Sequence, residues 1–329
     1  MQLEQEGLNK MNMKKLGLKL LTKYRTVSVL VLILIIATCL SNSFLTFNNL
    51  LNVIRQVSII AIIASGMTFV ILTGGIDLSV GSIVAISGAL SAYTLLNTNS
   101  VVLAIIVALI VGSICGAFNG IIITKGNLPP FIATLAVMTF VRGFVLVFTN
   151  GSPIAARMKA YNFIGKGYLF GIPFPIIILI VVFAIGFFIL KYTAFGRSVF
   201  SIGGNREATR LSGINVKRVE TLVYTISGLL AGLTGLILTA RLGSAQPTAG
   251  KGYELDAIAA VILGGTSLSG GQGAIIPTVF GALILGVLDN ILVLIDVNPF
   301  ASDIVKGFVI LLAVLADSKF KSVSSKLDE

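Results

Sequence analysis

The sequence contains no histidine, and only 11% of its 329 residues carry a charge. The absence of imidazole side chains excludes a Ser-His-Asp triad and any histidine-ligated metal within this chain. A soluble domain typically has about 25% charged residues, which lie mostly on its surface. Since 56% of this chain is hydrophobic, its polar residues are too few to cover a soluble globule. We therefore predict an all-α polytopic membrane protein and exclude a soluble enzyme.

Cysteine is scarce as well, and the two cysteines, Cys39 and Cys115, both lie inside apolar runs. We expect both to behave as small buried hydrophobic residues there. The sequence also lacks the G-x-x-x-x-G-K-[ST] motif with which a P-loop binds nucleotide phosphates. We expect no cofactor on this chain, so the energy for active transport would come from a partner protein or an ion gradient.

Several apolar runs approach the roughly 20 residues that a helix needs to cross the hydrocarbon core of a bilayer. They predict ten crossings, near residues 27–42, 50–73, 78–96, 101–124, 130–149, 173–191, 219–241, 254–269, 274–295 and 302–317. The eighth is short and rich in glycine, which favours a broken or re-entrant segment. Because no small-x-small cleavage site follows the first run, we expect it to be an uncleaved helix.

The charges that are present are mostly positive, with a formal net charge of +11. Basic residues concentrate on the cytoplasmic side of membrane proteins. With the N-terminus inside, 16 lysines and arginines fall in predicted cytoplasmic segments and 5 in external ones. This split predicts that both termini are cytoplasmic, and it explains the basic excess without a nucleic-acid partner. The predicted organisation is a basic segment at 1–26, a transmembrane domain at 27–317 with an internal loop at 192–218, and a cytoplasmic tail at 318–329.

Glycines recur at helical spacing in two of the predicted spans. Three lie on one face of the fourth span and two on one face of the seventh: Gly112, Gly116, Gly120, Gly228 and Gly232. Small residues at this spacing allow helix backbones to approach closely in a membrane. In addition, residues 74–81 and 264–271 share the pattern GGxxLSxG. This echo fits an internal repeat of the kind found in transporters, and it also fits two ordinary glycine-rich turns.

Polar side chains within the apolar runs are candidates for a translocation pathway. Asp77 lies between two runs, where a carboxylate is costly unless it is solvated, paired or protonated. It could line the pathway or cap the helix that begins near Ser79. We predict as pathway residues Asp77, Ser79, Asn119, Thr134, Arg142 and Asn290. The same side chains could equally hold helices together.

The loop at 192–218 has 27 residues, which is long for an inert connection. Asn205 is a plausible N-cap, Glu207 would lie in the first helical turn, and Gly213 would end the helix. We predict one or two turns of helix with Ala208, Leu211 and Ile214 as an apolar face.

The same loop carries a resemblance to a known family. Glu207-Ala208 followed by Gly213 resembles the Glu-Ala-Ala…Gly coupling motif of ABC importer permeases, with Thr209 in place of the second alanine. The resemblance covers about residues 43 to 317. The similar stretches within it include GIDLSVGS at 75–82, FIATL at 131–135, TNGSP at 149–153, SAQPTAG at 244–250 and GYELDAIAAV at 252–261. The chain resembles the permease subunits of bacterial monosaccharide importers, those for ribose above all.

This resemblance implies a multi-pass protein of the bacterial cytoplasmic (inner) membrane that passes D-ribose into the cytoplasm. It implies three protein partners besides membrane lipid: a cytoplasmic ATPase that uses ATP and Mg, a periplasmic or surface-anchored sugar-binding protein, and a second permease copy in a homodimer. The implied ATPase-coupling residues are Asn205, Glu207, Ala208, Arg210, Leu211, Gly213 and Ile214.

Other functions remain open from the sequence. An ion-coupled secondary transporter would use Asp77 or Asp289 as a proton or cation site. A channel is less favoured, because no filter motif or ring of selectivity residues is visible. Within the family, the sugar could be xylose, galactose or a ribose-like signalling sugar.

Overall fold

The computed structural model describes residues 25–298, 301–309 and 311–312. Its helices are α2 (Arg25–Leu40), α3 (Phe47–Leu72), α4 (Val80–Thr98), α5 (Val101–Gly126), α6 (Pro130–Thr149), α7 (Lys159–Lys166), α8 (Phe174–Tyr192), α9 (Ala194–Gly204), α10 (Arg206–Leu211), α11 (Val216–Leu242), α12 (Tyr253–Leu263) and α13 (Ile275–Leu294). Residues 301–309 and 311–312 are also helical. The predicted basic segment lies outside the described residues except for 25 and 26, and the predicted tail lies wholly outside them.

Seven of the described helices are long and apolar enough to cross a membrane, namely α3, α4, α5, α6, α8, α11 and α13. Each coincides with one of the ten predicted crossings. The other three predictions fall on shorter helices: α2 with 16 residues, α12 with 11, and the helical residues after 300. At 1.5 Å per residue α12 spans about 16 Å, roughly half of the hydrocarbon core. The count of ten full crossings is therefore not confirmed, and the short α12 supports a broken eighth segment.

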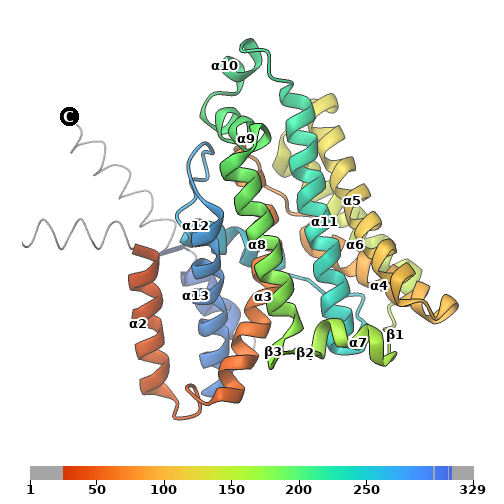
Figure 1. The fold of residues 1–329 in the computed structure, drawn as a ribbon, viewed down its shortest axis with the longest axis vertical. Coiled ribbons are helices and arrows are strands. Elements are labelled where there is room, and N and C mark those ends of the chain that lie inside the picture. The colour runs from red at the N-terminus through yellow and green to blue at the C-terminus, as the bar shows by residue number, and fades with distance from the viewer. Residues whose placement is uncertain (1–24, 299–300, 310, 313–329) are drawn as a thin grey trace, which may run out of the picture.

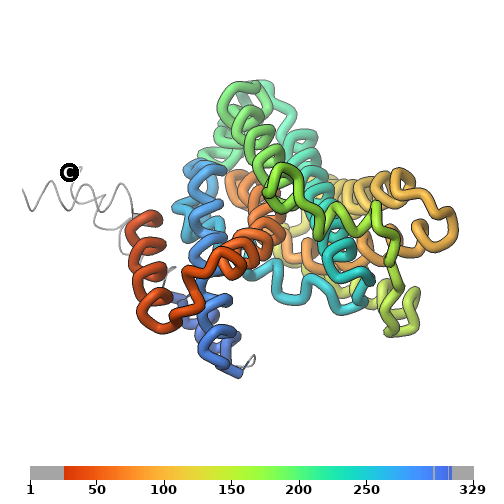
Figure 2. The backbone as a smooth tube through the Cα atoms, turned by 60° about the horizontal axis from the view of Figure 1, so that its bottom comes forward, coloured from red at the N-terminus to blue at the C-terminus, as the bar shows by residue number. Residues whose placement is uncertain are grey.

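The helices α3, α4 and α11 form the centre of the bundle, and the other helices cover them. Of the most apolar stretch of α3, 83% is buried, against 22% in α5. The helix α11 packs against α3, α4 and α5, and it runs beside them in both views (Figures 1 and 2). Apolar side chains on the covering helices, such as Phe140 and Val147, are exposed and suit contact with lipid. The prediction that both cysteines are buried is wrong, because Cys39 is exposed on the outlying helix α2 and Cys115 is only half-buried in α5.

The two ends of the bundle carry different short elements (Figure 1). The helices α9 and α10 lie at one end. At the other end lie α7 and the strands β1 (Ile154–Ala155), β2 (Tyr168–Leu169) and β3 (Ile172–Pro173). Antiparallel pairing joins β1 to β4 (Ser244–Ala245), with Ile154 opposite Ala245, while β2 and β3 form a hairpin. We call these the α10 end and the hairpin end.

The glycine faces of α5 and α11 pack against each other, as their spacing predicts. A Cβ atom on Gly116 would overlap the Tyr224 carbonyl oxygen and lie 3.0 Å from the Cα of Gly228. Gly112 and Gly120 meet α11 backbone in the same way, at Gly228 and Thr221. These glycines therefore hold two long helices together within one chain.

We expect Gly116→Ala to destabilise the purified protein by about 1–3 kcal/mol, because backbone atoms cannot rotate away from the added methyl group. Gly143 in α6 offers a matched control, since a Cβ atom there meets nothing within 4 Å. Gly143→Ala should be neutral or slightly stabilising, because alanine is the better helix former. Thermal unfolding in detergent measures both, and equal melting temperatures for the two variants would contradict the packing argument.

The two GGxxLSxG segments lie side by side in the fold. The first occupies the break between α3 and α4, and the second lies in the break between α12 and α13. The Gly271 N–H donates a hydrogen bond to the Leu72 carbonyl at 2.9 Å, and Gly270 approaches the backbone of Gly74. The two breaks are thus one contact region, which we call the paired breaks. Their flanking helices differ in length, with 26 residues in α3 and 11 in α12.

Candidate functional site

The loop at 192–218 folds into two helices rather than one. The Thr193 hydroxyl accepts the Gly196 N–H at 3.1 Å and begins α9. Asn205 separates the helices, and its side chain accepts the Ala208 N–H at 2.9 Å, as an N-cap should. The helix α10 lies where the short helix was predicted, while its role in coupling stays a prediction. We missed α9, although Phe195, Val199 and Ile202 have the spacing of a helical apolar face.

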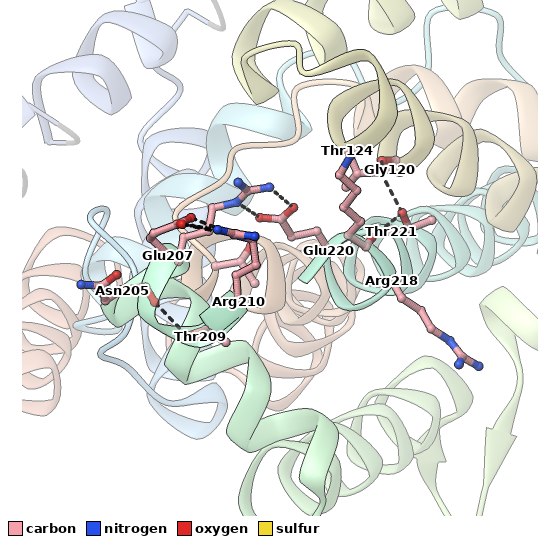
Figure 3. Close-up of polar contacts among 12 residues, drawn as sticks. Gly120, Thr124, Asn205, Glu207, Thr209, Arg210, Arg218, Glu220 and Thr221 are labelled. Atoms are coloured by element: carbon pink, nitrogen blue, oxygen red, sulfur yellow. Dashed lines mark hydrogen bonds and ion pairs between the residues drawn. The ribbon is translucent and has the colours of Figure 1, made fainter. Parts of the chain in front are cut away.

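Ion pairs tie α10 to α11 and stiffen α10 itself (Figure 3). The Arg206 guanidinium donates to both Glu220 carboxylate oxygens, at 2.8 and 3.0 Å. Glu220 is buried in α11, so this bidentate pair anchors the start of α10 to a central helix. Within α10, Arg210 donates to Glu207 at 3.1 Å. That hydrogen bond lowers the pKa of Glu207, and the bond to Glu220 raises the pKa of Arg206.

The outer face of α10 has no partner among the described residues. Glu207, Ala208 and Arg210 are exposed, and Leu211 is 73% exposed. Thr209 faces inward instead: it is buried, and its hydroxyl donates to the Asn205 carbonyl at 2.8 Å. An exposed leucine beside an exposed ion pair, on a helix fixed to the bundle, is suited to binding another protein.

Gly213 and Ile214 complete the predicted coupling set at the end of α10. Gly213 has φ +84°, a left-handed conformation that favours glycine, and a Cβ atom there would meet nothing within 4 Å. Ile214 is half-buried, and its N–H donates to the Thr209 carbonyl at 3.4 Å. The chain therefore turns back toward α11 directly after the exposed helix. We call Asn205–Ile214 the coupling surface, after the role that the family resemblance implies for these residues.

Three of the predicted pathway residues meet in a buried polar network. Asp77 accepts the Ser79 N–H at 3.0 Å and the Ser79 hydroxyl at 2.6 Å on one carboxylate oxygen. The other oxygen accepts the Ser227 hydroxyl of α11 at 2.9 Å. The Asn119 amide of α5 donates to the Ser79 hydroxyl at 2.7 Å. All four residues are buried, so the network joins the α3–α4 break to both glycine-bearing helices.

The remaining predicted pathway residues lie apart from this network. The Thr134 hydroxyl donates to the Pro130 carbonyl at 2.9 Å and reaches the Ile76 carbonyl at 3.3 Å. Asn290 exchanges two amide hydrogen bonds with Asn49, at 2.8 and 2.9 Å. The contacts with Ile76 and with Asn49 each join two segments of the bundle, whereas the bond to Pro130 lies within α6.

Arg142 binds a segment that lies beyond α11. Its guanidinium donates to the backbone carbonyls of Pro247 and Ala249, at 2.9 and 2.8 Å. Neither carbonyl belongs to a helix or strand, so Arg142 fixes an otherwise irregular stretch of chain. Sequence reasoning could not place this contact, because it joins residues more than 100 positions apart.

Comparison with known proteins identifies the family. Residues 49–314 match the family described as the branched-chain amino acid transport system / permease component. The chain belongs to this permease family. With seven apolar helices of spanning length among its described residues, this permease is a multi-pass membrane protein. No solved structure matches it.

Relatives resemble this permease over almost their whole length. The ribose import permease RbsC of Bacillus subtilis is 54% identical over 88% of this chain and 91% of that protein. The ribose import permease RbsC of Haemophilus influenzae is 47% identical, over 91% of this chain and 94% of its own. The xylose transport system permease XylH of Escherichia coli is 35% identical over similar shares, 89% and 91%. All three names describe transport subunits.

Proposed function

We propose that this permease is the membrane subunit of an ATP-driven importer that carries D-ribose into the cytoplasm. The observation that carries the proposal is the difference in identity among the relatives. Relatives named for ribose are 47% and 54% identical to the chain, whereas the relative named for xylose is 35% identical. Xylose is therefore the less favoured substrate, and galactose or a signalling sugar stays an alternative within the family.

The proposed partners fit the two ends of the bundle. A cytoplasmic ATPase, which hydrolyses ATP with Mg, would dock on the coupling surface at the α10 end. A periplasmic or surface-anchored sugar-binding protein would deliver substrate at the hairpin end, and a second permease copy would complete a homodimer in the lipid bilayer. This orientation places both termini in the cytoplasm, as the 16-to-5 distribution of basic residues supports.

The proposed mechanism is alternating access driven from the coupling surface. Closure of the ATPase would displace α10, and the Arg206–Glu220 pair would pass that displacement to α11. Since α11 packs on α3, α4 and α5, its movement would shift the bundle between inward-open and outward-open packings. The helices move as rigid bodies in this scheme, and the ion pair serves as the joint.

The coupling surface can be tested in the complete transporter with ATPase and binding protein. We expect Glu207→Lys and Gly213→Asp each to reduce ATP-driven ribose uptake by at least about tenfold, because reversing or inserting a charge in a docking surface weakens its contacts. Insertion into the membrane should be unchanged, since both sites are exposed. Uptake of labelled ribose and ATPase stimulation are the measurements.

Lys125→Glu is the matched control for this experiment. Lys125 is exposed at the end of α5, outside the coupling surface, and its reversal changes the charge as much as Glu207→Lys does, in the opposite direction. It should keep uptake near the parent value. Normal uptake with normal ATPase stimulation in both test variants would refute the assignment of the coupling surface.

A further inference from the structure

Two cavities adjoin at the hairpin end of the bundle. The outer one has a volume of about 510 Å³ and lies against β1, α7 and the start of the segment after α11, with Arg157, Asn162 and Lys166 in its wall. The inner one, of about 540 Å³, lies between α3, α11, α12, α13 and the helical residues after 300. Leu242 and Gln246 line both cavities. These two side chains therefore form the boundary between the two cavities.

The inner cavity gathers polar groups in a chain that has few of them. Two lysine or arginine residues and two carboxylates line it: Arg241, Lys306, Asp256 and Asp289. Lys306 and Asp289 form an ion pair at 2.9 Å. The four formal charges cancel, so the cavity offers no net attraction to an anion or a cation. This balance favours a neutral ligand over a phosphorylated sugar or an amino acid.

The uncharged groups in the wall are suited to hydroxyl groups. Gln56 of α3, Gln246 and Thr248 offer both hydrogen-bond donors and acceptors. Tyr253 of α12 adds an aromatic ring, and Ile59 and Ile60 add apolar surface for the carbon face of a ligand. A concave, largely preformed site with a few polar groups is the usual form of a small-molecule pocket, for which volumes of about 300–1,000 Å³ are typical.

We propose that the inner cavity is a binding subsite for one neutral monosaccharide, which reaches it through the outer cavity. Gln56, Thr248 and Asp256 hydrogen-bond the sugar hydroxyls, and Tyr253 packs on the ring. This proposal rests on the proposed function, since it names where the transported sugar pauses.

Two further contacts give the subsite its shape. Arg142 is a positioning residue, because its bonds to the carbonyls of Pro247 and Ala249 fix the stretch that carries Thr248. The Gln246 amide donates to the Ser244 hydroxyl at 2.9 Å, which holds Gln246 where the cavities meet. Passage of the sugar then requires the Gln246 and Leu242 side chains to move aside.

Cysteine protection tests the subsite in membrane vesicles that contain the whole transporter. Cys39 and Cys115 are first replaced by serine, and Ala249→Cys is introduced into the wall of the inner cavity. A membrane-impermeant methanethiosulfonate reagent should label this cysteine from the hairpin end. At a ribose concentration ten times the dissociation constant, labelling should slow by about tenfold, since only the empty fraction reacts. Asn97→Cys, exposed at the end of α4 and outside both cavities, should label at the same rate with and without ribose.

Two further measurements define the ligand. Ribose 5-phosphate should give no protection at the same concentration, because the cavity has no net positive charge. Adding Gln56→Ala should raise the ribose concentration for half-protection by about tenfold, as expected for loss of a good hydrogen bond.

The outcomes separate this proposal from the proposed function. The subsite is wrong if ribose, xylose and galactose all leave the labelling rate unchanged. It is also wrong if the cysteine at 249 never reacts. Either result can occur while ATP-driven ribose uptake is normal, so neither refutes the proposed function. If ribose 5-phosphate protects the cysteine as well as ribose does, the assignment of a neutral ligand is wrong. Protection by ribose in vesicles whose uptake does not depend on the ATPase would leave the subsite standing and refute the proposed function.

Discussion

Replacing Asp77 by alanine is expected to lower the melting temperature of the purified permease by about 5–10 °C. The carboxylate accepts hydrogen bonds from the Ser79 N–H, the Ser79 hydroxyl and the Ser227 hydroxyl, and all of these groups are buried. Alanine leaves the donors without an acceptor in an apolar bundle. Leaving these buried donors without an acceptor costs about 2.5 kcal/mol, within the roughly 1–3 kcal/mol of an unsatisfied buried group. Each kcal/mol shifts the melting temperature of a large domain by about 2–4 °C, which gives the expected 5–10 °C.

Two other variants locate the source of this effect. Asp303→Ala removes an exposed carboxylate and should change stability by less than about 0.5 kcal/mol. Ser227→Ala removes a single donor to the Asp77 carboxylate and should cost about 1 kcal/mol. Thermal unfolding in detergent gives all three values. If Asp77→Ala melts within about 2 °C of Asp303→Ala, the network does not hold the break in place as we infer.

Asp77→Asn separates a structural carboxylate from an ion-coupling one. An asparagine keeps one acceptor oxygen and the size of the side chain, so the bundle should lose less stability than with alanine. Because the Asp77 oxygens are already engaged by buried donors, we expect ribose uptake to persist in this variant. Loss of uptake in a variant that melts normally would favour an ion-coupled transporter instead.

The class of the protein and most of its helices could be predicted from the sequence. Composition alone indicates a membrane protein, because a chain with so few polar residues cannot cover the surface of a soluble protein in any fold. Long apolar runs predict ten crossings, and seven of these coincide with described helices of spanning length, because length and hydropathy are local properties. The run at 254–269 was predicted as the eighth crossing, but its helix α12 is too short to span, because it stops at Leu263, just before the Gly264–Gly265 pair. Gly265 has φ +89°, a conformation that does not continue a helix.

The site was predictable to the extent that its contacts are local. Asn205, Glu207 and Gly213 lie within ten residues, and capping rules were enough to predict α10 from them. The Arg206–Glu220 pair joins a loop helix to a spanning helix, and the Asp77–Ser227 bond joins residues 150 positions apart. No periodicity or spacing encodes such contacts, because they depend on how the helices pack. The polar residues inside the spans were therefore recognised as important, while their partners were not.

A second large effect is expected at Gly203, near the end of α9. A Cβ atom there would overlap the Leu72 carbonyl oxygen and the Gly271 backbone nitrogen, which belong to the paired breaks. The helix α9 thus connects the coupling surface to the paired breaks, which separate α3 from α4 and α12 from α13. Backbone atoms on both sides leave no side chain that could rotate to make room, so α9 must move away from the breaks.

We expect Gly203→Ala to reduce ATP-driven ribose uptake by at least about tenfold while the ATPase still hydrolyses ATP, because α10 can bind its partner but no longer moves the breaks. Gly204→Ala is a matched control in the next position, where a Cβ atom meets nothing within 4 Å. Both changes replace glycine by a better helix former, so helix propensity cannot explain a difference between them. Uptake and ATP hydrolysis are measured in the same proteoliposomes. Equal uptake by the two variants would mean that contact between α9 and the paired breaks does not transmit the motion, and that the Arg206–Glu220 pair must transmit it alone.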